Sequence, residues 1–279
     1  MIRESRGISV ASLALCAFLW SSGGILIKLV SWDSFAIAGG RSLIGCITML
    51  IILKKPRFTF SFNQIMAALS YSATMILFVF ANKMTTSANA VLLQYVEPVY
   101  IIILGRWLLT NEKSTFVDWI VVATVFGGMI LFFLDDLSFS ANMGNVLAVL
   151  SGITFALTAI FMRRQKNERP SDSFILAHFL TFVLSIPFMF RSGLPSGGSL
   201  IGLLLLGVFQ MGIPSVLYGR GISGVTAVSA ALITMIEPVL NPVWVAIFFG
   251  EIPGKRAIIG GLIILGGVTF RSVLKARKM

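Results

Sequence analysis

The sequence has little charge, only two cysteines and a single histidine. Of its 279 residues 12% are charged and 57% are apolar, and the mean hydropathy is +0.93. A soluble domain usually has about a quarter of its residues charged, so this composition excludes a water-soluble globular protein. One histidine supports no metal site, and Cys16 and Cys46 lie in apolar segments, where they read as small apolar residues and not as a disulfide. We therefore predict a membrane protein without a metal or cofactor.

Ten apolar segments are long enough to cross a membrane as helices. A spanning helix takes about 20 residues, so ten of them use roughly 200 and leave too few for a soluble catalytic domain. The predicted spans are 9–29, 35–53, 65–81, 87–104, 117–134, 144–162, 174–190, 200–218, 225–250 and 257–273. The expected fold is an all-α membrane protein with ten transmembrane helices.

The basic residues indicate how these helices are oriented. A net charge of +11 would favour nucleic-acid binding in a soluble protein, but here the basic residues lie in the connections and the expected partner is the lipid bilayer. If the N-terminus is inside, 16 of the 22 Lys and Arg residues are cytoplasmic, and Arg41 lies within a span. The outer side has five, namely Lys28, Lys83, Arg191, Lys255 and Arg256. By the positive-inside rule we predict that both termini are cytoplasmic.

Several short motifs recur in the same order after 135 to 140 residues. The pairs are Trp20 with Phe155, Asp33-Ser34-Phe35 with Asp172-Ser173-Phe174, Glu97-Pro98 with Glu237-Pro238, Glu112 with Glu251, and Gly127-Gly128 with Gly266-Gly267. The chain is therefore predicted to contain two five-helix repeats, 1–136 and 137–279. Because five is odd, the second repeat is inverted in the membrane, and inverted repeats are typical of transporters that work by alternating access.

Prolines should interrupt the fourth and ninth spans. Pro98 removes a helix hydrogen bond to the carbonyl of Gln94, and Pro238 does the same to Thr234, while Pro242 adds a second break. Loosened turns with polar residues in the membrane favour a binding site. A simple packing kink is the alternative.

Glu97 and Glu237 stand about ten residues into these helices, where a carboxylate must be protonated, paired or hydrated. Arg41 is the only basic residue well inside a span, and we expect it to pair with Glu97. Leu180 occupies the repeat position of Arg41, so Glu237 has no evident partner. We expect Glu237 to exchange a proton or to bind the amino group of a substrate. The alternatives are a structural clamp, or a carboxyl group without a direct role.

Other residues have weaker signals. Trp20 and Phe155 are expected to form aromatic walls or to pack in the core, Arg163 to anchor its helix at the membrane surface, and His178 to be a satisfied polar group. Glycine pairs in the fifth and tenth spans indicate close helix packing. The candidate substrate-binding residues are Trp20, Arg41, Gln94, Tyr95, Glu97, Phe155, Thr234, Glu237 and Asn241.

The chain resembles the EamA-type transporters of the drug/metabolite transporter superfamily. The resemblance rests on the order of these motifs, which begins at Trp20, includes both Glu-Pro pairs and ends each half with a glutamate. The resemblance covers the whole chain as two EamA domains. It implies a carrier of the bacterial cytoplasmic membrane, with spans one to four and six to nine around a central cavity and spans five and ten outside it. Many relatives export amino acids or other small metabolites. The chain departs from the pattern at Leu180, so the role of Arg41 is one-sided.

The expected function is secondary transport of a small polar or zwitterionic, amino-acid-like metabolite, in the export direction and by alternating access. We expect a monomer or homodimer, and the sequence leaves proton coupling open. A channel or a non-transporting receptor is the main alternative, because a polar site at the membrane midplane serves either. An intramembrane enzyme is less favoured, since no H-E-x-x-H motif or nucleophile constellation is visible.

Overall fold

A computed structural model describes residues 5–28, 30–85, 87–109, 112, 114–135, 142–249 and 254–277. The regular elements in these ranges are all helices. The first half contains α1 (Arg6–Trp20), α2 (Gly23–Lys28), α3 (Ser34–Leu53), α4 (Phe62–Met84), α5 (Ser87–Gln94), α6 (Glu97–Leu108) and α7 (Phe116–Phe133). The second half contains α8 (Asn142–Arg164), α9 (Ser171–Ser192), α10 (Gly197–Leu205), the π-helix η1 (Leu206–Gly212), α11 (Ile213–Gly224), α12 (Ala227–Thr234), α13 (Ile236–Phe249) and α14 (Lys255–Arg277).

These elements account for every predicted span. Eight helical stretches are long and apolar enough to cross a membrane, and two shorter apolar helices, Arg6–Trp20 and Ala227–Leu240, occupy the first and ninth positions. The all-α multi-pass fold is thereby confirmed. The predicted boundary between residues 136 and 137 lies outside the described residues and stays a prediction.

The fourth and ninth spans are broken where the prolines predict. Helix α5 ends at Gln94 and α6 begins at Glu97, with Pro98 in its first turn, where a missing N–H costs nothing. Helix α12 ends at Thr234 and α13 begins at Ile236. Each span therefore consists of two half-helices that meet near the middle of the predicted span.

Two further irregularities were not predicted. The first span breaks after Trp20, where the hydroxyl groups of Ser21 and Ser22 each donate a hydrogen bond of 2.6 Å to a carbonyl three residues earlier. Such side-chain bonds compete with the helix hydrogen bonds. The eighth span widens into the π-helix η1, a form that is frequent at functional sites.

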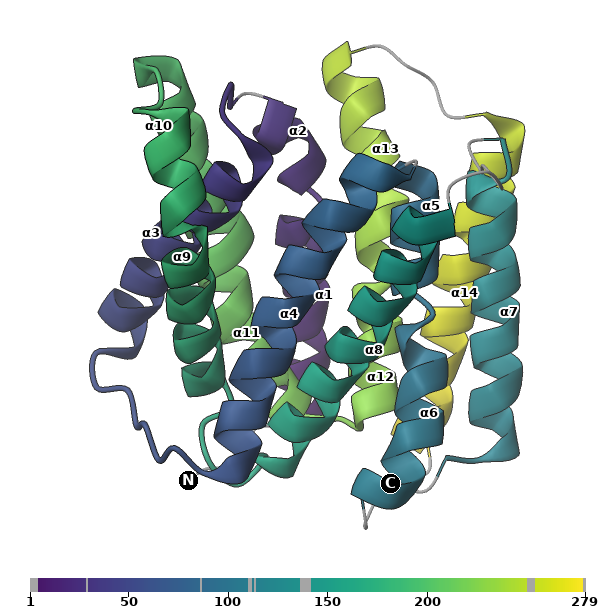
Figure 1. Cartoon of the computed structure of the whole chain (residues 1–279). Helices are drawn as coiled ribbons and strands as arrows, with labels where there is room; N and C mark the ends of the chain where they lie inside the picture. The colour runs from purple at the N-terminus through teal and green to yellow at the C-terminus, as the bar shows by residue number, and fades with distance from the viewer. Residues whose placement is uncertain are drawn as a thin grey trace.

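The helices form a bundle in which the two halves interleave. Helix α4 packs along α8, α3 along α9, and α1 against α11, while α7 and α14 pair at one edge, on the right in Figure 1. A Cβ atom added to Gly260 on α14 would lie 2.5 Å from the carbonyl oxygen of Gly128 on α7, so the predicted close packing of these two helices is confirmed. Both ends of the chain lie at the same end of the bundle (Figure 1).

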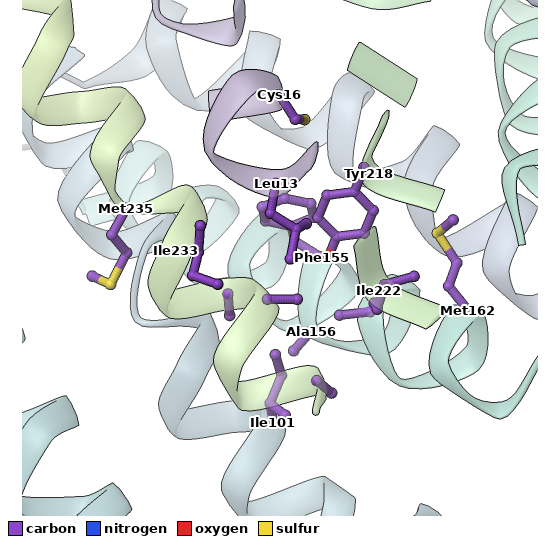
Figure 2. Close-up of a cluster of buried hydrophobic side chains, with 14 of the residues drawn as sticks. Leu13, Cys16, Ile101, Phe155, Ala156, Met162, Tyr218, Ile222, Ile233 and Met235 are labelled. Carbon is purple, nitrogen blue, oxygen red and sulfur yellow. The ribbon is translucent and has the colours of Figure 1, made fainter. Parts of the chain in front are cut away.

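An apolar layer fills the centre of the bundle near this end. Figure 2 shows Leu13 of α1, Phe155 of α8, Tyr218 and Ile222 of α11, and Ile233 of α12 gathered in one cluster. All five side chains are buried. Because they come from both halves of the chain, this layer ties the two halves together where both chain ends lie.

Candidate transport site

A cavity of about 540 Å³ lies between the two halves of the bundle. Its walls come from the described parts of α1, α2, α3, α4, α5, α8, η1 and α13. Lys83, which is exposed, and Ser34 line it at the end of the bundle away from the two chain ends, and Trp20 and Phe155 line it toward the apolar layer. A cavity of this size suits a small organic ligand.

The cavity brings together most of the residues that the sequence singles out. The predicted residues that line it are Trp20, Arg41, Gln94, Tyr95, Phe155, Glu237 and Pro238. Glu97, Thr234 and Pro98 do not line it, and the Thr234 hydroxyl donates to the carbonyls of its own helix. The side chains of Asn241 and Pro242 lie outside the described part of the chain.

The expected pair of Arg41 and Glu97 is wrong. Arg41 is buried, and its Nη1 donates a hydrogen bond of 3.3 Å to Oε1 of Gln210 on η1. Both carboxyl oxygens of Glu97 lack a hydrogen-bond partner among the described residues, so no Arg41–Glu97 pair forms there. The helix break explains why Arg41 and Glu97 do not meet. It turns the side chain of Tyr95 toward the cavity, whereas the side chain of Glu97 does not line the cavity. Depth in the membrane, the basis of the expectation, does not determine which way a side chain faces.

Glu237 is not without a partner, so that expectation is also wrong. Its Oε2 accepts a hydrogen bond of 2.5 Å from the hydroxyl group of Tyr95. Tyr95 precedes α6 and Glu237 opens α13, so the bond joins the two broken spans at their breaks. The two halves of the repeat therefore meet at an acidic residue that lines the cavity.

Aromatic rings form one wall of the cavity. The ring of Trp20 lies 6.1 Å from that of Phe155 and stacks on Tyr218 at 5.6 Å. Tyr71 of α4 lies 6.5 Å from Phe155 and also lines the cavity. The predicted aromatic pair does meet, and such rings can hold an apolar or cationic group.

Sequence reasoning missed Tyr71 and Gln210. Each is a polar residue in an otherwise apolar span, which is the signal that could have identified them. The π-helix that holds Gln210 has no comparable signal in the sequence. The expectation for His178 is met at only one ring nitrogen. Its Nε2 lies 3.0 Å from the hydroxyl oxygen of Ser215, whereas its buried Nδ1 has no partner among the described residues.

The end of the bundle that holds both chain ends is closed by polar bonds between helices. Arg163 forms an ion pair with Glu112 and donates hydrogen bonds to the carbonyl oxygens of Ile222, at 2.9 Å, and Ser223. The other oxygen of Glu112 accepts a bond of 3.0 Å from the backbone N–H of Ala227. Arg163 is therefore not the simple surface anchor that we expected. It links α8 and α11 to the loop before α7.

A second ion pair at this end is deeply buried. Nε of Arg271 on α14 lies 2.8 Å from Oδ1 of Asp118 on α7, and Nη2 lies 2.6 Å from the same oxygen. Asp118 also caps the start of its own helix by accepting a bond of 2.7 Å from the N–H of Thr115. Together with the Arg163 pair, these bonds hold this end shut.

At the cavity mouth, Lys83 of α4 lies 3.4 Å from Asp33, which caps α3. Partial burial alone would raise the pKa of Asp33. Hydrogen bonds from the backbone N–H groups of Phe35 and Ala36, together with the Lys83 ammonium, outweigh this effect and lower the pKa below its ordinary value. Asp33 is therefore an anion at neutral pH.

The sequence pattern of the EamA-like transporter family matches residues 7–134 and again residues 142–273. The chain belongs to the EamA-like transporter family. The two matches correspond to the two halves of the chain, and the drug/metabolite transporter resemblance read from the motifs is thereby confirmed.

Several relatives of this EamA-like chain are named as transporters. An uncharacterized transporter of Archaeoglobus fulgidus is 24% identical over 259 residues, covering 92% of this chain and 94% of the relative. The pseudopaline exporter CntI of Pseudomonas aeruginosa is 24% identical over 269 residues, 93% of each chain. A solved protein crystal structure has the same fold, with a TM-score of 0.84 at 16% identity over 98% of this chain and 99% of that one.

Proposed function

We propose that this EamA-like protein is a secondary transporter that exports a small zwitterionic, amino-acid-like metabolite by alternating access. The observation that carries the proposal is that Arg41 and Glu237 line one cavity together with aromatic rings. A guanidinium binds a carboxylate through paired hydrogen bonds, and a carboxylate binds an ammonium group. The Trp20 and Phe155 rings then contact the body of the substrate.

Arg41 has donors left for such a ligand. Within the described residues its only hydrogen bond goes to the neutral amide of Gln210, and its Nε has no partner. A buried charge bonded to a single neutral group is poorly compensated, so an incoming carboxylate gains a strong charge-assisted bond. The Tyr95 hydroxyl supports Glu237 in the same way while leaving one of its oxygens for the ligand.

The shape of the cavity supports a carrier over a channel. The cavity leads from the mouth at Lys83 to the aromatic wall, and the apolar layer and the ion pairs of Arg163 and Arg271 lie between it and the chain ends. A site that is open on one side and closed on the other is what alternating access requires. The export direction is supported by the relative named as an exporter.

The orientation is part of the proposal. With the basic residues inside, both chain ends are cytoplasmic, the protein lies in the bacterial cytoplasmic membrane, and the cavity mouth faces outward. We propose that the protein works as a monomer or a homodimer.

Counterflow into proteoliposomes tests the proposal. Vesicles loaded with one proteinogenic L-amino acid, a simple amine or a simple sugar are diluted into the labelled form of the same compound. We expect saturable counterflow with amino acids, and no counterflow with any of the compounds would contradict the proposal. A flux that does not saturate would indicate a channel instead.

Two variants with matched controls identify the binding residues. Arg41→Gln and Glu237→Gln should each weaken substrate binding by about 10-fold to about 140-fold, because each loses one charge-assisted hydrogen bond of about 1.5–3 kcal/mol. Arg191→Gln and Glu168→Gln change the same residue types at exposed positions away from the cavity and should behave as the wild type. Equal effects in all four variants would refute the assignment.

A further inference from the structure

Glu97 has an unusual environment for a carboxyl group. Its exposed fraction is 0%, and within the described part of the chain neither carboxyl oxygen has a hydrogen-bond partner. It opens α6 directly after the helix break and does not line the large cavity. An ionised carboxylate without partners in an apolar interior is very costly, so Glu97 holds a proton in this conformation.

Among the residues that the structure describes, no basic side chain donates a hydrogen bond to Glu97. The groups that interact with Glu97 electrostatically are Glu237 of α13, Tyr95 of the preceding turn and Tyr218 of α11. Three helices pack against α6, and the first of them, α12, has no titratable residue. The titratable residue of α7 is Asp118, and those of α8 are Arg163 and Arg164. All three lie at the ends of their helices next to the two chain ends. In the described part of the chain, Arg41 donates its hydrogen bond to Gln210 and does not pair with Glu97.

Residues on either side of Glu97 in the sequence line two different cavities. Ile101 and Gly105 follow Glu97 at steps of four residues along one buried face of α6, and Leu109 follows directly after the end of that helix. These three residues line a small cavity of about 20 Å³, which is room for about one water molecule. Glu112 and the ion pair of Asp118 and Arg271 line the same cavity. On the other side, Tyr95 and Glu237 line the large cavity.

We propose that Glu97 is the proton-coupling site of the transporter, which rests on the proposed function. In the outward-open conformation its carboxylate takes a proton from the large cavity, and in the inward-open conformation it releases that proton through the small cavity to the cytoplasm. One proton enters as one substrate molecule leaves. The ionised Glu97 beside Glu237 strengthens the hold on the substrate ammonium, and its protonation weakens that hold on the outside.

Glu97→Gln separates coupling from binding, because glutamine keeps the shape of the side chain and cannot titrate. In proteoliposomes containing the amino acid that gives the largest counterflow, this variant should retain saturable counterflow, with a higher half-saturation concentration than the wild type, but should lose uptake driven by an imposed pH gradient. The accompanying signal of an enclosed pH dye should also be lost. Glu97→Asp should restore part of both, whereas Glu237→Gln should lose counterflow as well. Wild-type pH-driven uptake in Glu97→Gln would overturn the proposal.

The failure of coupling is distinguishable from the failure of transport. Wild-type counterflow without any response to a pH gradient would overturn the role of Glu97 and leave the proposed function standing.

Infrared spectra give a test without substrate, because a protonated carboxyl group has its own carbonyl-stretch band. At neutral pH this band should be present in the wild type and in Glu237→Gln and absent in Glu97→Gln. The same band intensity in all three proteins would also overturn the proposal.

Discussion

The ion pair of Arg163 and Glu112 should control how often the end of the bundle that holds both chain ends opens; the proposed orientation makes this the cytoplasmic side. In the structure these side chains are only 12% and 13% exposed, and the guanidinium also binds two carbonyl oxygens of α11. Glutamine at position 163 keeps part of the hydrogen bonding but removes the charge. The loss of one charge-assisted hydrogen bond is about 1.5–3 kcal/mol, which shifts the equilibrium toward the inward-open state by about 10-fold to about 140-fold.

A cysteine at Val228 reads out this equilibrium. Val228 is 7% exposed and lines the small cavity near the end of the bundle that holds both chain ends, so it should become accessible when that end opens. In a background with Cys16 and Cys46 replaced by alanine, the rate of Val228→Cys alkylation from the cytoplasmic side is proportional to the open population. We expect Arg163→Gln to raise this alkylation rate by about 10-fold to about 140-fold.

The matched control is Arg256→Gln. Arg256 pairs with Asp135 at the opposite end of the bundle, but these side chains are 58% and 59% exposed, and an ion pair so exposed contributes little. The alkylation rate of Val228→Cys should therefore stay at its value in the unmodified background. Equal rates in the Arg163 and Arg256 variants would refute the view that the Arg163 pair holds the cytoplasmic side closed.

Three further predictions concern topology and stability. A cysteine at Leu194, which is exposed, should react with an impermeant maleimide on intact cells, whereas one at Asn167 should react only after permeabilisation, and the reverse would invert the orientation. Asp118→Asn should lower the free energy of unfolding by about 3–5 kcal/mol, because its arginine partner becomes a buried unpaired charge; an unchanged denaturation midpoint would contradict this. Gly260→Ala should destabilise the protein by about 1–3 kcal/mol through overpacking, while Gly266→Ala, whose Cβ would meet no atom within 4 Å, should not.

The sequence was sufficient to predict the membrane class, the helical segments and the two breaks. Hydropathy determines the segments because unpaired backbone groups are excluded from lipid, and Pro98 and Pro238 determine the breaks because proline cannot continue a helix hydrogen-bond pattern. The repeat then correctly indicated that Trp20 meets Phe155. These features follow from local chemistry and from symmetry, and both are visible in one sequence.

The roles of the two glutamates could not be predicted in this way. The sequence gives the depth of a residue in the membrane, but the phase of a helix after a break depends on how its neighbours pack. The break turns Tyr95 toward the cavity and buries Glu97, so the partner that we expected for Glu97 donates its hydrogen bond to Gln210 instead. The π-helix that brings Gln210 to Arg41 is likewise a consequence of tertiary packing.

Reciprocal accessibility of the two sides tests alternating access most directly. A cysteine at Val79, which lines the large cavity, reports the outward-open state, and Val228→Cys reports the inward-open state. Both alkylation rates are measured from their own sides, with and without Arg163→Gln. The account predicts that the variant raises the rate at position 228 and lowers the rate at position 79. If both rates rise together, the two sides open at once and the protein is a channel, not a carrier.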